Sequence, residues 1–83
     1  MMKVLQQGIE PVERVNILIS FTSIESIDVK QALIDHLSRG LSASASSAVN
    51  AVKPSNFSRA LSILEEVAKK VEQIKEIDYK HIT

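Results

Sequence analysis

The sequence predicts an all-α protein, a small helical domain with a helix-turn-helix and a long C-terminal helix. Apolar residues recur at helical spacing in four segments. Signals for helix starts and stops separate these segments, and a chain of 83 residues is long enough for one domain only. We therefore expect a single helix-turn-helix domain over residues 1–83, with helices at about 11–21, 25–39, 43–50 and 55–77 and a frayed tail over 78–83.

The first two segments each carry one apolar face. Pro11 suits the opening turn of the first helix, and Phe21 closes it. The second helix starts at a capping box, Thr22-Ser23-Ile24-Glu25, with Ser26 as a second possible cap, and stops at a left-handed Gly40. The faces expected to be buried are Val12, Val15, Leu18 and Ile19 in the first helix, and Val29, Leu33, Ile34 and Leu37 in the second.

The third segment is rich in serine, a composition that a flexible linker would also have. Its apolar spacing favours a short helix that begins at an N-cap, Ser42. The stripe consists of Leu41, Ala45, Ala48, Val49 and Val52. Pro54 cannot continue this helix but suits the start of the next one. The inner stripe of that last helix is Phe57, Ala60, Leu61, Leu64, Ala68 and Val71.

Composition argues against an enzyme, and we expect no catalytic residues, no metal and no cofactor. The chain has no cysteine, so it has neither a disulfide nor a thiolate ligand. His36 is expected on the surface of the second helix and His81 in the loose tail, both away from any acidic cluster. Two glycines cannot form a glycine-rich phosphate loop. Without a long apolar run or a signal peptide, the chain is expected to be cytoplasmic with no membrane partner.

The charges are balanced overall, ten basic against ten acidic residues, but they are unevenly distributed. From His36 to Leu64 there is no acidic residue, while this stretch holds three basic residues and eight serines. It contains the short helix, the turn and the start of the last helix. In a helix-turn-helix the second helix presents its first residues to the DNA groove. The distribution therefore predicts contact with double-stranded DNA, ending where Glu65 and Glu66 begin.

The predicted DNA-binding side chains are polar or positively charged and lie around the turn. Serine and asparagine can hydrogen-bond bases or phosphates, and arginine can do either. Helical spacing places positions 55, 59 and 62 on one outward face. A serine-rich, solvated face of an ordinary helical bundle remains the alternative. The set is Arg39, Ser42, Ser44, Lys53, Ser55, Asn56, Ser58, Arg59 and Ser62.

A second apolar stripe lies beside the main one on the last helix. A chain of this size supplies one small core, so a helix that is apolar on two sides favours self-association over internal packing. Covering of the first helix is the alternative. The predicted oligomer interface consists of Ile63, Val67, Ile74 and Ile77.

From about Gly8 to Val71 the chain resembles the PapB-type regulators of bacterial fimbrial (adhesin biosynthesis) operons. The shared spacing is carried by Thr22-Ser23-Ile24-Glu25-Ser26, Ala32-Leu33, Asp35-His36-Leu37, Gly40 and Ser42, then by Val52, Phe57-Ser58, Ala60-Leu61 and Leu64. The resemblance implies an all-α regulator that assembles along AT-rich DNA near fimbrial promoters, with contact in the minor groove proposed for the family. It also implies a bacterial, nucleoid-associated location.

Two functions remain open at this point. The first is a DNA-binding transcription regulator acting as a dimer or higher homo-oligomer on AT-rich sites. The alternative is a helical interaction module or anti-regulator that forms mixed oligomers without binding DNA. The acid-free segment favours the first. The second is favoured by Ala43-Ser44, which stand where the similar family commonly has Arg-Lys, and by Ile63, where it often has a basic residue.

Overall fold

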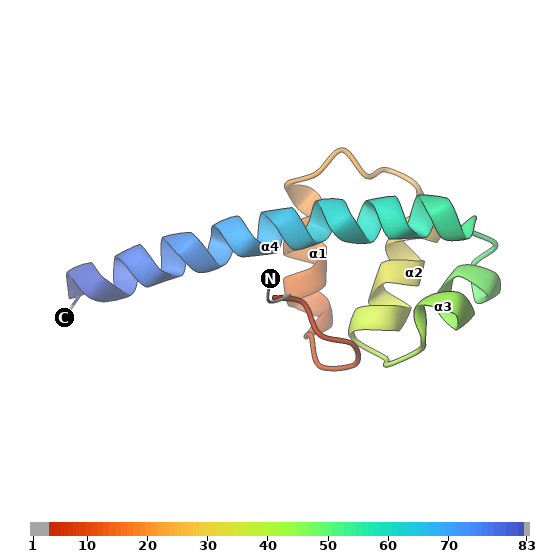
Figure 1. The fold of residues 1–83 in the computed structure, drawn as a ribbon, viewed down its shortest axis with the longest axis horizontal. Coiled ribbons are helices and arrows are strands. Elements are labelled where there is room, and N and C mark those ends of the chain that lie inside the picture. Colours follow the sequence, from red (N-terminus) through yellow and green to blue (C-terminus); the bar gives the residue numbers. More distant parts are fainter. Residues whose placement is uncertain (1–3, 83) are drawn as a thin grey trace.

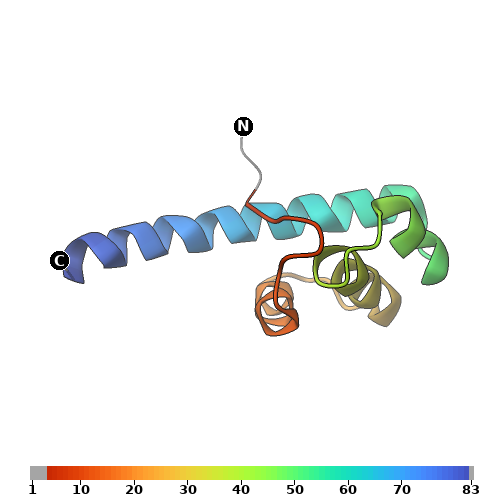
Figure 2. The same ribbon diagram turned by 90° about the horizontal axis from the view of Figure 1, so that it is seen from below.

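Four helices form the described part of the chain. The computed structural model describes residues 4–82, with α1 (Val12–Ser20), α2 (Ile27–Leu37), α3 (Ala43–Val49) and α4 (Pro54–Ile82) and no strand among them. α4 lies across the other three as a second layer, and each of them packs against it (Figure 1). Seen from below, α1, α2 and α3 lie on one side of α4 (Figure 2). The predicted all-α class and the long C-terminal helix are confirmed.

The helix starts follow the serine signals, with one correction. Ser26, not the capping box before it, is the N-cap of α2, and its Oγ accepts the N–H of Val29 at 3.3 Å. Thr22 Oγ1 instead accepts the N–H of Ile24 at 3.1 Å. α2 therefore begins two residues later than predicted. Ser42 caps α3 as expected, because its Oγ accepts the N–H of Ala45 at 3.0 Å.

The core is the inner stripe of α4 packed on the apolar faces of α1 and α2. Phe57 is 1% exposed, and its ring meets that of His36 edge-on, with centroids 5.6 Å apart. His36 was predicted on the surface, but this contact half-buries it, and its Nδ1 lies 2.8 Å from the carbonyl oxygen of Leu41. The buried apolar residues are Leu5, Val15, Leu18, Ile19, Ala32, Leu33, Leu37, Phe57, Ala60, Leu64 and Ala68. Val12, expected among them, is exposed near the start of α1.

The face that α3 buries differs from the predicted one. Ser46 and Ser47 are buried, whereas Ala48 and Val49 are exposed. The side-chain amide of Asn50, the C-cap of α3, donates to Asp35 Oδ2 at 2.9 Å and holds the helix in this rotation. The predicted stripe was therefore wrong at Ala48 and Val49, whereas Leu41, Ala45 and Val52 are half-buried. The small serines allow α3 to lie close to its neighbours.

Ser46→Ala is expected to raise the free energy of unfolding by about 1 kcal/mol. The Ser46 side chain is fully buried, and within residues 4–82 its Oγ has no hydrogen-bond partner, so folding removes it from water without compensation. Denaturant midpoints of the variant and the wild type provide the measurement. Ser47→Ala is the control, because Ser47 Oγ donates to the Ala43 carbonyl at 2.8 Å and its loss should not stabilise. A lower midpoint for Ser46→Ala would contradict the expectation.

The segment before α1, residues 4–10, is bonded to α2 and α4, and the sequence patterns did not predict these contacts. The N–H groups of Val4 and Leu5 donate to the carboxylate of Glu65 on α4, the second at 3.0 Å. Further along, the N–H of Gly8 donates to the carbonyl of His36 at 3.1 Å. Gly8 has φ +75°, and a Cβ there would lie 3.1 Å from the Cα of Gly40. The close approach requires glycine at position 8, and the φ of +86° favours glycine at position 40.

α4 is longer than predicted, because it continues through Ile82 instead of ending at 77 with a frayed tail. Thr83 lies outside the described residues. No glycine or proline interrupts the helix after Pro54. Ion pairs of Lys69 with Glu66 at 3.6 Å and of Lys75 with Glu72 at 3.1 Å link successive turns. Lys80 and His81 lie in the last turn, where positive charge suits the helix dipole.

Candidate nucleic-acid interface

The turn between α3 and α4 has a defined helix-ending geometry. Ala51 adopts a left-handed conformation with φ +55°. Its N–H donates to the carbonyl of Ala48 at 3.2 Å, and the N–H of Val52 donates to that of Ser47 at 2.9 Å. This pair of bonds is a Schellman motif, which satisfies the last carbonyls of α3. Residues 50–53 thus form a tight turn that fixes the start of α4 relative to α3 (Figure 1).

All nine predicted DNA-binding residues have exposed side chains. Lys53 and Arg59 make no ion pair with any residue of the described chain, so their charges face solvent. Arg39 lies at the other end of α3, and its Nη1 is 3.6 Å from Asp35 Oδ1. Six of the nine candidates therefore lie in the turn and the first turns of α4, whereas Arg39, Ser42 and Ser44 lie at the opposite end of α3. This set of six, called the α4 start surface below, is Lys53, Ser55, Asn56, Ser58, Arg59 and Ser62.

A shallow hollow borders the α4 start surface on the side of the α1–α2 connection. Its lining includes Asn56, Arg59 and Ile63 from α4 and Glu25 from the connection. The start of α4 is thus approached in space by a carboxylate that lies outside the acid-free stretch of the sequence. Sequence reasoning missed this neighbour, because it depends on the path of the chain between α1 and α2.

A buried acidic residue stabilises the geometry below this surface. Asp35 is 6% exposed, and its carboxylate accepts bonds from Gln31 Nε2 and from Asn50 Nδ2, each at 2.9 Å. The Asn50 bond lowers the pKa of Asp35 most; burial opposes this, and Gln31 and Arg39 add to the lowering. The network ties α2 to the last turn of α3. Asp35 follows the buried Ala32 by three positions, a spacing from which its inward orientation could have been read.

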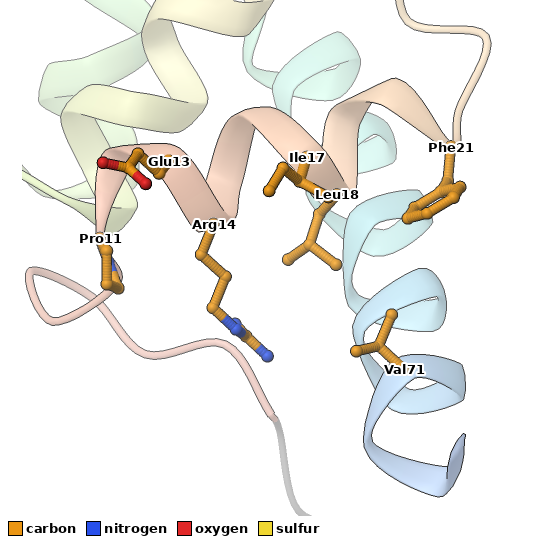
Figure 3. A pocket seen from close by; sticks show the side chains of 7 residues that line it. All are labelled: Pro11, Glu13, Arg14, Ile17, Leu18, Phe21 and Val71. Atoms are coloured by element: carbon orange, nitrogen blue, oxygen red, sulfur yellow. The ribbon is translucent and has the colours of Figure 1, made fainter. Parts of the chain in front are cut away.

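The predicted oligomer stripe is largely exposed. Ile63, Ile74 and Ile77 are 40%, 58% and 56% exposed, whereas Val67 is half-buried and packs against the core. Beside this stripe a groove opens between α1 and α4 (Figure 3). It is lined by Pro11, Glu13, Arg14, Ile17, Leu18, Phe21 and Val71.

Within 4–82, no three histidine, aspartate or glutamate side chains come close enough together to hold a metal ion. None of the helices described has the length and apolar character needed to cross a membrane. No protein-family model, no curated protein and no solved structure matches this chain.

Proposed function

We propose that the protein is a DNA-binding transcription regulator that acts as a dimer or higher oligomer on AT-rich double-stranded DNA. The observation that carries this proposal is the α4 start surface. It presents two unpaired cations and four short polar side chains on the first turns of a helix that a rigid turn positions. The resemblance to the PapB-type regulators supports a bacterial fimbrial or adhesin operon as the target. It also supports a cytoplasmic, nucleoid-associated location.

The proposed contacts follow from charge and geometry. Lys53 and Arg59 neutralise phosphates, and each contact releases counterions from the DNA. The first N–H groups of α4 and its partial positive charge add attraction for a phosphate. Ser55, Asn56 and Ser58 have short side chains that can donate to phosphates or base edges.

Arg59→Ala and Lys53→Ala are each expected to weaken binding to AT-rich DNA. Each lost phosphate contact should reduce the slope of log affinity against log salt by about 0.9. Both side chains are exposed and unpaired, so helix content should not change. Electrophoretic shifts over a salt series measure the slope, and circular dichroism checks the fold.

Lys70→Ala is the matched control, because Lys70 is also an exposed cation on α4 but lies beyond this surface. The control should bind like the wild type. Wild-type affinity and slope in the Arg59→Ala/Lys53→Ala double variant would remove the α4 start surface from the proposal. A loss of about 1–3 kcal/mol confined to the preferred sequence would instead mean that Arg59 contacts a base.

A helical interaction module or anti-regulator is the second candidate. Glu25, beside Arg59 in the hollow, favours it because a carboxylate there repels phosphate. A wild-type protein that fails to shift AT-rich DNA even at low salt would support this function over the first.

A further inference from the structure

The groove between α1 and α4 is apolar over most of its length. Figure 3 shows Ile17, Leu18 and Phe21 of α1 on the side toward Val71 of α4. Ile17 and Phe21 are 59% and 67% exposed, so water contacts two large apolar side chains there. The groove has a volume of about 510 Å³, which lies within the range of small-molecule sites. An apolar group that fills the groove therefore removes water from these side chains.

One end of the groove has a carboxylate without a partner. Glu13 lies there, in the first turn of α1, and its side chain makes no hydrogen bond or ion pair within residues 4–82. Arg14, the cation that lines the groove, is 2.7 Å from Glu10 and 3.6 Å from Glu72. Lys75 is 3.1 Å from Glu72 as well. These five side chains are three carboxylates and two cations, so their net charge is negative by one, and the excess lies on Glu13.

We propose that the groove binds an amphiphilic amine, a small molecule with an apolar chain or ring and an ammonium group at one end. The apolar part lies against Ile17, Phe21 and Val71, and the ammonium lies beside Glu13. Phe21 follows Glu13 by eight residues, about 12 Å along α1, so the ligand is elongated. An apolar acid suits the groove less well, because Arg14 is already paired with carboxylates of the chain.

The length of α1 also favours a small molecule over a docked helix. α1 has nine residues, about two and a half turns, so a helix lying along it would gain only a short contact. The groove is separate from the α4 start surface. Val71 follows Ser62, the last residue of that surface, by nine residues, which is about 14 Å of helix. Amine binding can therefore be measured without DNA, and it does not depend on the proposed DNA contacts.

Three ligands with the same octyl chain test the preference for a positive charge. Octylammonium, 1-octanol and octanoate are positive, neutral and negative at neutral pH, and we expect their affinities to fall in that order. NMR titration of the wild type measures the dissociation constants and shows whether the resonances of Ile17, Phe21 and Val71 shift. Added salt should reduce the difference between the three ligands. Each methylene removed from the amine should weaken binding by up to about fourfold.

Two substitutions test the two ends of the groove. Glu13→Gln should weaken the binding of octylammonium by up to about fivefold and leave that of 1-octanol unchanged. Phe21→Ala should weaken the binding of all three ligands. Glu25→Gln is the matched control, because Glu25 is an exposed carboxylate that lines the other hollow, and it should bind octylammonium like the wild type. All three side chains are exposed, so the variants should fold, which circular dichroism checks.

Octanoate that binds as tightly as octylammonium would overturn the proposal, as would unchanged affinity for octylammonium in Glu13→Gln. A wild type without saturable shifts at the groove would also overturn it. A wild-type oligomer whose mass in sedimentation falls on Phe21→Ala would mean that a second copy of the chain fills the groove instead. None of these measurements includes DNA, so failure of this site and failure of the DNA interface are distinguishable.

Discussion

Replacing Phe57 with alanine is expected to lower the free energy of unfolding by about 3–5 kcal/mol. Phe57 is 1% exposed and lies in the first turns of α4, where its ring contacts the edge of His36 on α2. Truncation would leave a cavity where α4 packs on the other helices, and small helical domains have little stability to lose. Denaturant unfolding followed by circular dichroism measures the change.

Phe21→Ala is the matched control, since Phe21 is the chain's other phenylalanine and is 67% exposed. Measured in dilute solution, it should change the free energy of unfolding far less than Phe57→Ala. Equal effects of the two substitutions would mean that Phe57 is not the anchor of α4.

Replacing Asp35 with alanine is expected to cost about 1.5–3 kcal/mol at neutral pH, because hydrogen bonds to a charged acceptor are lost and Asn50 loses its partner. The pKa of Asp35 lies below its ordinary value of 3.8 in the folded protein. The folded state therefore favours the carboxylate. Its contribution is complete above the unfolded value and is lost as the pH falls through the folded pKa.

The pH dependence is measured as the difference in unfolding free energy between the wild type and Asp35→Ala. This difference should stay constant from neutral pH to mildly acidic pH and shrink below 3.8. Asp35→Asn, which keeps the size of the side chain without its charge, should show no titration of this site. A difference that grows on acidification would contradict the assignment.

The sequence was sufficient to predict the buried face of a helix where the apolar stripe consists of large side chains. The α4 stripe that contains Phe57 and Leu64 was predicted correctly, because big side chains at helical spacing can be covered in one orientation only. For α3 the pattern failed. Alanine and a single valine bury too little area to fix a rotation, so the bond from Asn50 to Asp35 decides it. That bond joins residues on two helices and has no local signature.

Contacts made by the backbone also could not be predicted from the sequence. The segment that contains Leu5 and Gly8 is held by main-chain N–H groups, which every residue type except proline carries, so no periodicity marks it. In the candidate interface, exposure of the short polar side chains could be predicted from their positions opposite the core stripe. The approach of Glu25 to Arg59 could not, since it requires the path of the α1–α2 connection.

The position of α4 in the chain affects when the domain can fold. α1, α2 and α3 all pack against α4, and the backbone at Leu5 is bonded to Glu65, sixty residues later. During synthesis the ribosome releases these three helices before the element that covers them. Their apolar faces stay without a partner until the chain through Ala68 has emerged. Folding of this domain is therefore delayed until α4 has emerged from the ribosome, and the nascent chain is exposed to chaperones and proteases until then.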